Sequence, residues 1–386
     1  MATDTKKKMS IPITKPSLGE EEARAPYESI KSGWVTQGPK VAEFEKAVAA
    51  YCGAQFGIAT TSCTTGLHLA LASLDLKAGD EVIVPSFTFI ASANAILYTG
   101  ATAVFAEIDP RTYNIDPTDI EHRITSKTKA IMPVDQIGLS CDMDVINAIA
   151  SKHGVDVVED AAPTIGSTYK GRRVGSNAHQ TVFSFHPRKV ITTGEGGMIT
   201  TDDEALAERA RKLRAHGMSV SDLDRHKADR IIIEEYNELG FNYRMTDIQA
   251  SIGLVQLRRL PELLRLRVAR ADRYNSELPA IRGLEIPFVP DYATHTYQSY
   301  CLRLTKDCKL DRDTLMTNLL HRGVATRRGV MASHLEKTYT DRNGKVSLPI
   351  TEEATNSTML IPLYATMTDD EQTYVIDSLR EELGSA

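Results

Sequence analysis

Short apolar runs alternate with segments of helical periodicity between residues 56 and 160 of this chain. The runs are rich in β-branched residues and lie at 56–61, 81–85, 103–108, 130–134 and 155–158. Because they are apolar at successive positions and not at every second one, both faces of each strand must be covered. Helices between successive strands cover a sheet in this way. The pattern therefore predicts an α/β fold with a mainly parallel sheet flanked by helices, in which ligands bind at the carboxyl ends of the strands.

Two charged residues fall at such strand ends. Lys189 follows an apolar run that Pro187 interrupts, and it precedes a glycine-dependent turn at 192–197. An amine held there becomes a nucleophile if its neighbours lower its pKa from its usual value of about 10.4; the alternative is a surface lysine on a hairpin. Asp160 ends a buried strand, where a carboxylate costs free energy unless it has a cationic partner, although it could also be a helix cap.

Two further features complete a candidate site. The segment Ser62-Cys63-Thr64-Thr65 precedes a helix, so its hydroxyls and backbone N–H groups form either an anion site or an ordinary N-cap. Phe89 follows a strand and could stack on a planar ring or belong to the core. A phosphorylated aromatic aldehyde with a basic ring nitrogen requires all four features together: a lysine, a carboxylate, a phosphate site and an aromatic face. The cofactor indicated is pyridoxal 5'-phosphate (PLP).

Several ordered motifs resemble those of the DegT family of PLP-dependent sugar aminotransferases. Together they extend from Lys15-Pro16 to Pro362-Leu363 and keep the family's order and spacing. The motifs are SCTTGLHLAL at 62–71, TF at 88–89, VEDAA at 158–162, FSFHPRK at 183–189, TGEGG at 193–197 and GFNYRMTD at 240–247.

The resemblance implies a type I aminotransferase fold, with a mainly parallel seven-stranded sheet in the large domain and a smaller C-terminal α+β domain. It implies a homodimer with active sites at the subunit interface. In this family Lys189 would form the Schiff base with PLP and shuttle protons, and Asp160 would pair with the pyridine nitrogen. Phe89 would lie against the ring.

The phosphate group of PLP would be held by Thr64, Thr65 and Ser184, and Asn242 would reach it from the partner subunit. One position departs from the family pattern. Three residues after the aspartate the family usually has Gln or His, near the cofactor hydroxyl, whereas this chain has Pro163, which offers no side-chain donor.

The resemblance further implies amino transfer in two half-reactions. An amino donor, L-glutamate in this family, would convert PLP to pyridoxamine 5'-phosphate, which would pass the amine to a keto-sugar carried on a nucleotide. The segment containing Arg327, Arg328 and His334 is where family members often contact substrate. Arginines suit a diphosphate, but the pair could also be solvated surface.

Two alternatives to this function remain. The acceptor could be a keto-cyclitol or another keto compound, or the chain could be a non-catalytic cofactor-binding regulator on the same fold. Some relatives are sugar dehydratases with histidine in place of the lysine, and Lys189 argues against that reaction.

Composition and charge restrict the partners and the compartment. With 386 residues, 42% of them hydrophobic, the chain can bury one large core and a smaller one. A net charge of −6 argues against nucleic acid as a partner, and no apolar run approaches the roughly 20 residues that span a bilayer. The polar start of the chain has no secretory pattern, and the five cysteines are scattered and odd in number. We therefore expect a cytoplasmic protein with reduced thiols and no metal site.

The expected domain organisation is a disordered tail over residues 1–10, a large cofactor-binding domain over 11–258 and a small domain over 259–386. Pro261 is expected to separate two long helices, one opening near Asp247 and one spanning 263–278. Residues 222–238 are polar and are expected to form a surface excursion.

Overall fold

The computed structural model describes residues 9–220, 231 and 233–384. Its centre is a seven-stranded sheet in the order β1-β9-β8-β5-β4-β2-β3. Neighbouring strands are parallel except β9, which is antiparallel to both β1 and β8. The strands are β1 (Phe56–Thr60), β2 (Glu81–Pro85), β3 (Thr102–Ala106), β4 (Thr128–Ile131), β5 (Asp156–Asp160), β8 (Gln180–Ser184) and β9 (Gly197–Thr201). The predicted α/β class and its mainly parallel sheet are confirmed.

Helices cover both faces of this sheet, which is why its strands are apolar throughout. In β8, Val182 packs against a core shared with α3, whereas Phe183 points to the opposite face and packs against α2 and α9. The helices on and around the sheet are α1 (Glu20–Ser32), α2 (Pro39–Cys52), α3 (Cys63–Ala72), α4 (Ala91–Tyr98), α5 (Pro117–Arg123), α6 (Met143–His153) and α7 (Glu204–Arg214). Short elements η1 (Gln136–Gly138), β6 (Thr168–Tyr169) and β7 (Arg172–Arg173) complete this part.

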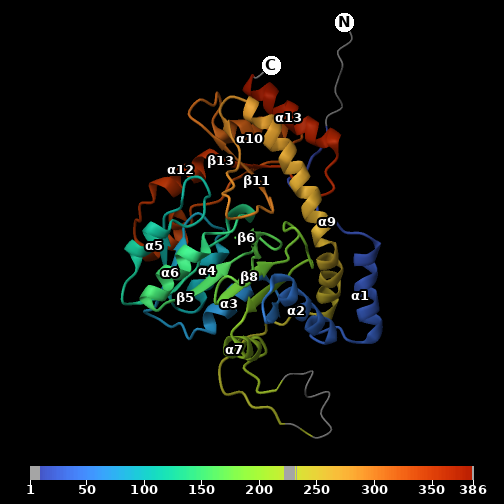
Figure 1. The fold of residues 1–386 in the computed structure, drawn as a ribbon, viewed down its shortest axis with the longest axis vertical. Coiled ribbons are helices and arrows are strands. Elements are labelled where there is room, and N and C mark those ends of the chain that lie inside the picture. The colour runs from blue at the N-terminus through green and yellow to red at the C-terminus, as the bar shows by residue number, and fades with distance from the viewer. Residues whose placement is uncertain (1–8, 221–230, 232, 385–386) are drawn as a thin grey trace.

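The C-terminal part is built on a second, four-stranded antiparallel sheet in the order β10-β11-β13-β12. Together with α10 and α13 this sheet forms the upper lobe in Figure 1, above the larger sheet. Its elements are η2 (Leu278–Ala280), β10 (Leu284–Glu285), β11 (Tyr300–Leu304), α10 (Arg312–His321), β12 (Arg327–Arg328), η3 (Ser333–Leu335), α11 (Lys337–Asn343), α12 (Pro349–Ser357), β13 (Thr358–Ile361) and α13 (Asp369–Leu383).

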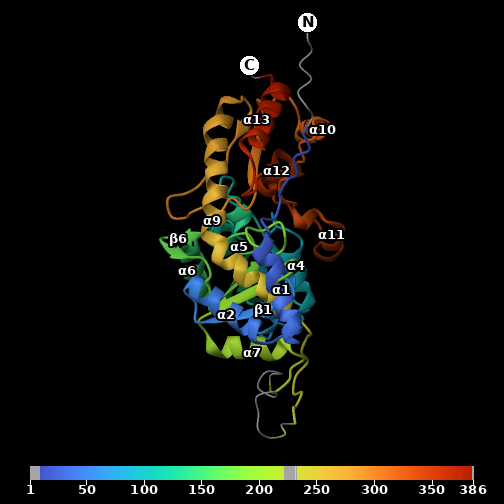
Figure 2. The ribbon, with the colours of Figure 1, turned by 90° about the vertical axis from the view of Figure 1, so that its right-hand side faces the viewer.

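One helix, α9 (Asp247–Glu277), runs through both parts. The prediction of two helices separated at Pro261 is wrong. Pro261 itself is exposed, while the nearby Leu260 and Leu263 are buried and hold the helix against its neighbours across the proline. Figure 2 shows α1 lying beside the lower half of α9. The predicted division at 258/259 lies inside this helix and stays a prediction.

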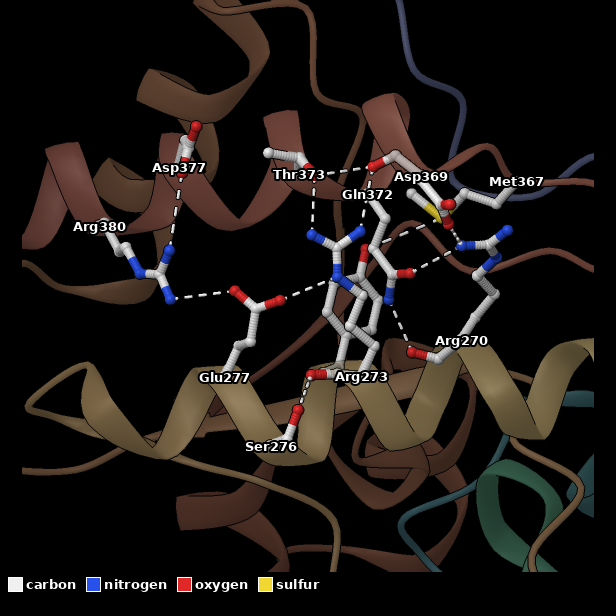
Figure 3. A network of polar contacts seen from close by, with 11 residues as sticks. Arg270, Arg273, Ser276, Glu277, Met367, Asp369, Gln372, Thr373, Asp377 and Arg380 are labelled. Atoms are coloured by element: carbon white, nitrogen blue, oxygen red, sulfur yellow. Dashed lines mark hydrogen bonds and ion pairs between the residues drawn. The ribbon is translucent and has the colours of Figure 1, made fainter.

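The upper half of α9 is joined to α13 by the polar network in Figure 3. The buried amide of Gln372 donates to the backbone carbonyl of Arg270 at 2.6 Å, and Arg273 donates to the hydroxyl of Thr373 at 2.7 Å. Glu277 accepts from both Arg273 at 2.8 Å and Arg380 at 3.1 Å. The C-terminal helix is therefore fixed to the helix that also supports the large sheet.

The N-terminal segment also contacts the C-terminal part. Ile11 pairs with Val324 and packs in the core of the C-terminal lobe. Residues 1–8 of the predicted disordered tail, and most of the predicted surface excursion at 222–238, lie outside the described residues. Among the helices of the described chain, none is both long and apolar enough to cross a membrane. The five cysteines all lie within the described residues and form no disulfide.

Candidate active site

A cavity of about 640 Å³ lies where β1, β5 and β8 end, with residues of the C-terminal part completing its wall. Besides Ser62, which caps α3, six of the predicted cofactor-site residues and one of the three candidate substrate residues line it. They are Cys63, Thr64, Phe89, Asp160, Ser184, Lys189 and Arg327. The cavity therefore brings together strand ends, a helix N-terminus and the C-terminal sheet.

Asp160 is the buried acid of this cavity, with 4% of its surface exposed. The hydroxyl of Ser92 in α4 donates to its Oδ2 at 2.7 Å, and the backbone N–H of Ala162 donates to its Oδ1 at 3.1 Å. Burial raises the pKa of this carboxyl above its usual value, and the two hydrogen bonds and the charge of Lys189 oppose that rise. A cation bound beside Asp160 would favour its ionised form.

Lys189 reaches the same cavity from the turn after β8. Its backbone N–H donates to the carbonyl of His186 at 2.8 Å, and the turn that follows passes through Gly194, whose φ of +85° suits glycine. Burial lowers the pKa of the Lys189 amine, while Cys63 and Asp160 act in the opposite direction. The sequence made a nucleophilic role of Lys189 conditional on a pKa lowered by its neighbours; the main cause of the lowering is burial, and the neutral amine is the nucleophilic and proton-accepting form.

The N-terminus of α3 forms another wall. Ser62 caps the helix, accepting from the N–H of Thr65 at 3.2 Å, and the Thr65 hydroxyl lies 3.0 Å from the N–H of Ser62. Helix geometry leaves the N–H groups of Cys63 and Thr64 without intrahelical acceptors, so they can bind an anion in the cavity. The hydroxyl of Thr65 is used in the cap, and Thr65 is not among the residues that line the cavity.

The glycines of the TGEGG motif let the chain pass close to this helix start. A Cβ atom on Gly197 would lie 2.5 Å from the carbonyl oxygen of Ser62, which is closer than any carbon–oxygen contact allows. Gly197 is therefore required for close packing between β9 and the cap of α3. The sequence predicted a tight turn there, but not this contact.

Phe89 presents its ring at the cavity although 65% of its surface is exposed. A large apolar side chain that remains this exposed beside a cavity can cover a flat ligand. Ser184 lines the cavity at the end of β8 and accepts a long hydrogen bond of 3.4 Å from the N–H of His186.

Other predicted site residues lie elsewhere. Asn242 is exposed, pairs through its backbone with Ala215 and does not line the cavity of its own chain. Arg328 lies 3.7 Å from Glu336 and is also absent from the lining.

His334 is buried, with Ser86 Oγ 2.6 Å from its Nδ1 and Glu352 3.4 Å from its Nε2, so it joins η3 and α12 to the end of β2 instead of facing the cavity. Pro163 offers only its backbone, whose carbonyl accepts from the hydroxyl of Thr296 at 2.9 Å.

Several lining residues were not predicted from the sequence. They are Ser92, His186, Arg188, Glu195 and Gln298 among others. Arg188 and His186 lie within the FSFHPRK motif and Glu195 within TGEGG, so proximity to Lys189 could have indicated them. Ser92 and Gln298 carry no comparable local signal, because they approach the cavity from α4 and from the loop before β11.

Comparisons with known proteins show the family to which this chain belongs. The sequence matches the DegT/DnrJ/EryC1/StrS aminotransferase family over residues 16–380. It is 40% identical over 375 residues to the spore coat polysaccharide biosynthesis protein SpsC of Bacillus subtilis, covering 96% of each chain.

Among solved structures, the aminotransferase TlmJ from Streptoalloteichus hindustanus matches with a TM-score of 0.89 at 35% identity, over 97% of this chain and 99% of that one. The putative sugar aminotransferase Spr1654 from Streptococcus pneumoniae in its PLP form matches with a TM-score of 0.90 at 29% identity, over 97% and 98%. The expected family, fold and enzyme class are confirmed: this chain is an aminotransferase that belongs to the DegT/DnrJ/EryC1/StrS family.

Proposed function

We propose that this enzyme uses PLP to transfer an amino group from an amino acid, L-glutamate, to a keto-sugar carried on a nucleoside diphosphate, as a step of amino-sugar biosynthesis. The observation that carries the proposal is that Asp160 and Lys189 line one cavity together with the start of α3 and Phe89. The names of the relatives support a sugar as the acceptor, since one acts in polysaccharide biosynthesis and one is a putative sugar aminotransferase.

The residues of the cavity fit PLP. The buried carboxylate suits the ring nitrogen and the amine suits the aldehyde. The free N–H groups of the helix start suit the phosphate, and the exposed aromatic face suits the plane of the ring. When bound, PLP supplies an electron sink that stabilises negative charge at the α-carbon of the amino acid.

The protein groups then have separate roles. Asp160, oriented by Ser92 and Ala162, accepts a hydrogen bond from the protonated ring nitrogen and keeps it charged. The N–H groups of Cys63 and Thr64 and the hydroxyl of Ser184 bind the phosphate oxygens.

Lys189 Nζ would hold PLP at its aldehyde carbon and, as a free amine, would take up and return a proton at the substrate carbon. Its lowered pKa suits that role because a neutral amine is the base.

The same proposal extends to the assembly and its location. We place two copies in a homodimer with active sites at the interface, where the exposed Asn242 of one copy would reach the phosphate in the other, and we place the enzyme in the cytoplasm. Sedimentation equilibrium of the purified protein tests the dimer: a monomer at micromolar concentration would contradict it.

Spectroscopy of the PLP-loaded enzyme tests the reaction. Addition of L-glutamate should bleach the visible band of the bound cofactor and release 2-oxoglutarate, and a panel of nucleotide keto-sugars and keto-cyclitols should identify the compound that restores the band. Lys189→Ala should bind PLP without the band and show no turnover. Wild-type turnover by Lys189→Ala would refute the assignment, and turnover with a keto-cyclitol alone would replace the sugar as acceptor.

A further inference from the structure

Two arginines from distant parts of the chain face the same cavity. Arg188 lies directly before Lys189 in the turn after β8, and Arg327 lies in β12 of the C-terminal sheet. Both side chains are exposed, and within the described residues neither guanidinium has a hydrogen bond or an ion pair. The geometry points to Arg188 and Arg327 as the pair that binds the diphosphate of the acceptor, which makes them specificity-determining residues. This inference rests on the proposed function.

The backbone of Arg188 is held from both sides. Its N–H donates to His186 Nδ1 at 3.2 Å, and its carbonyl accepts from the side-chain amide of Gln298 at 2.7 Å. The carbonyl of Gln298 in turn accepts from the buried Arg267 at 2.6 Å. A side chain on such a fixed backbone loses less conformational freedom when it binds a ligand, which favours affinity.

Arg327 is fixed in a comparable way from the opposite wall. Its strand pairs with β13 in the register Arg327–Leu360, and Leu360 lines the cavity as well. The neighbouring Arg328 points elsewhere and pairs with Glu336. Since successive side chains of a strand point to opposite sides, Arg327 is the one of the two that the strand directs into the cavity.

The positions of the charges favour a diphosphate over the carboxylates of the amino donor. Lys189 and Asp160 lie inside the cavity, whereas Arg188 and Arg327 are exposed at its edge. When the carbonyl of the sugar reaches Lys189 inside the cavity, the nucleotide must remain outside the cavity. The diphosphate, which joins the sugar to the nucleotide, then lies at the edge where Arg188 and Arg327 are exposed. Each of the two guanidinium groups can bind one phosphate group in a bidentate manner, and together they match the two negative charges of the diphosphate.

Binding of free nucleoside diphosphates to the PLP-loaded enzyme tests the pair. Isothermal titration with UDP and dTDP should give a measurable affinity, and Arg188→Gln and Arg327→Gln should each weaken it roughly tenfold or more, the usual loss for a charge-assisted hydrogen bond. Arg188→Lys should restore only part of the affinity, because a lysine lacks the planar fork. Arg328→Gln is the matched control and should bind both ligands as the wild type does.

Two readouts separate this inference from the proposed function. Bleaching of the cofactor band by L-glutamate should keep its wild-type concentration dependence in Arg327→Gln, and melting temperature and PLP content should show that all variants are folded. The inference would be overturned if both Gln variants bound UDP and dTDP as tightly as the wild type does, or if the wild type bound neither. Neither result would contradict the proposed amino transfer. A loss confined to L-glutamate would also overturn it, since the arginines would then bind the donor. An enzyme that never reacts with an amino donor would refute the proposed function instead.

Discussion

The hydroxyl of Ser92 donates to Oδ2 of Asp160 at 2.7 Å, and this contact fixes how the buried acid faces the cavity. The other oxygen accepts from the N–H of Ala162 at 3.1 Å, so donors from two separate segments hold the carboxylate. Because charged hydrogen bonds favour the ionised form, they oppose the burial that raises the pKa of Asp160. A residue of α4 with no local sequence signal thus supports the chemistry of a residue in β5.

Replacing Ser92 with alanine should weaken PLP binding by roughly tenfold, because the ionised form of Asp160 would lose a charged hydrogen bond. The pKa of Asp160 should rise further, so the pH below which PLP affinity falls should move upwards. Titration of the cofactor-free protein with PLP at several pH values measures both effects. Ser251→Ala removes a hydroxyl that donates to Ile248 in α9 and should leave PLP affinity unchanged; equal affinity of the Ser92→Ala and wild-type proteins would show that this contact does not act on the cofactor.

Gly197→Ala should disturb the phosphate site. Its new Cβ would lie 2.5 Å from the Ser62 carbonyl, which belongs to backbone and cannot swing away, so β9 or the start of α3 must move. Overpacking of this kind costs about 1–3 kcal/mol of stability, and we expect a lower PLP affinity as well. Thermal melting with and without PLP measures both. Gly19→Ala serves as the control, since the nearest atom to its Cβ would be 3.5 Å away; unchanged PLP affinity in Gly197→Ala would contradict the predicted contact.

Arg267→Met should be strongly destabilising. The buried guanidinium donates to the carbonyls of Tyr297, Gln298 and Leu363 at 3.1, 2.6 and 3.2 Å, and burial lowers its pKa to about 10. Methionine would leave these carbonyls without donors, at a cost of about 3 kcal/mol or more in the free energy of unfolding. Urea denaturation measures this loss. Arg265→Met on the exposed side of the same helix is the matched control, and a loss of equal size there would mean that the carbonyl contacts contribute nothing.

His295 should make the protein less stable in acid. Burial lowers its pKa to about 3, whereas a histidine in an unfolded chain has a pKa of about 6.5. As the pH falls from 6.5 towards 3 the unfolded chain takes up a proton that the folded chain does not. Stability should therefore fall by up to about 1.4 kcal/mol per pH unit from this residue.

His295→Asn should reduce that slope, since asparagine can still accept a hydrogen bond as His295 Nδ1 does from the N–H of Tyr297 at 2.9 Å but takes up no proton. Unfolding in urea at pH 7, 6, 5 and 4 measures the difference between the two proteins. Parallel pH profiles would exclude His295 as a cause of acid sensitivity.

Much of the fold followed from local patterns. The apolar runs that became β1, β2 and β5 could be recognised because residues next to one another in the sequence are buried together on both faces of the sheet. The helix break expected at Pro261 was wrong. The expectation rested on the rule that proline interrupts a helix, but packing against α1 and α2 keeps α9 continuous. The contact of Ile11 with Val324 could not be read from either segment, since more than 300 residues separate them.

Some residues of the candidate site could likewise be predicted from local patterns, whereas the directions of other side chains could not. Lys189, Asp160 and the Ser62–Thr65 segment were indicated by residue type at predicted strand and helix ends, and such positions converge in any parallel α/β sheet. The directions of the Thr65 and His334 side chains could not be derived from the sequence. Thr65 is held by a hydrogen bond within a helix cap, and His334 by one to Ser86, which follows the distant strand β2.

The amino-acid sequence by itself determined the layered architecture, the family and the candidate pair Lys189 and Asp160, because these depend on hydrophobic periodicity and on a few motifs whose chemistry is local. Only the tertiary structure decided which side chains orient Asp160, that a proline would lie within one continuous helix, and which of two adjacent arginines faces the cavity. These outcomes depend on packing and hydrogen bonds between segments far apart in the chain, and no stretch of sequence contains both partners.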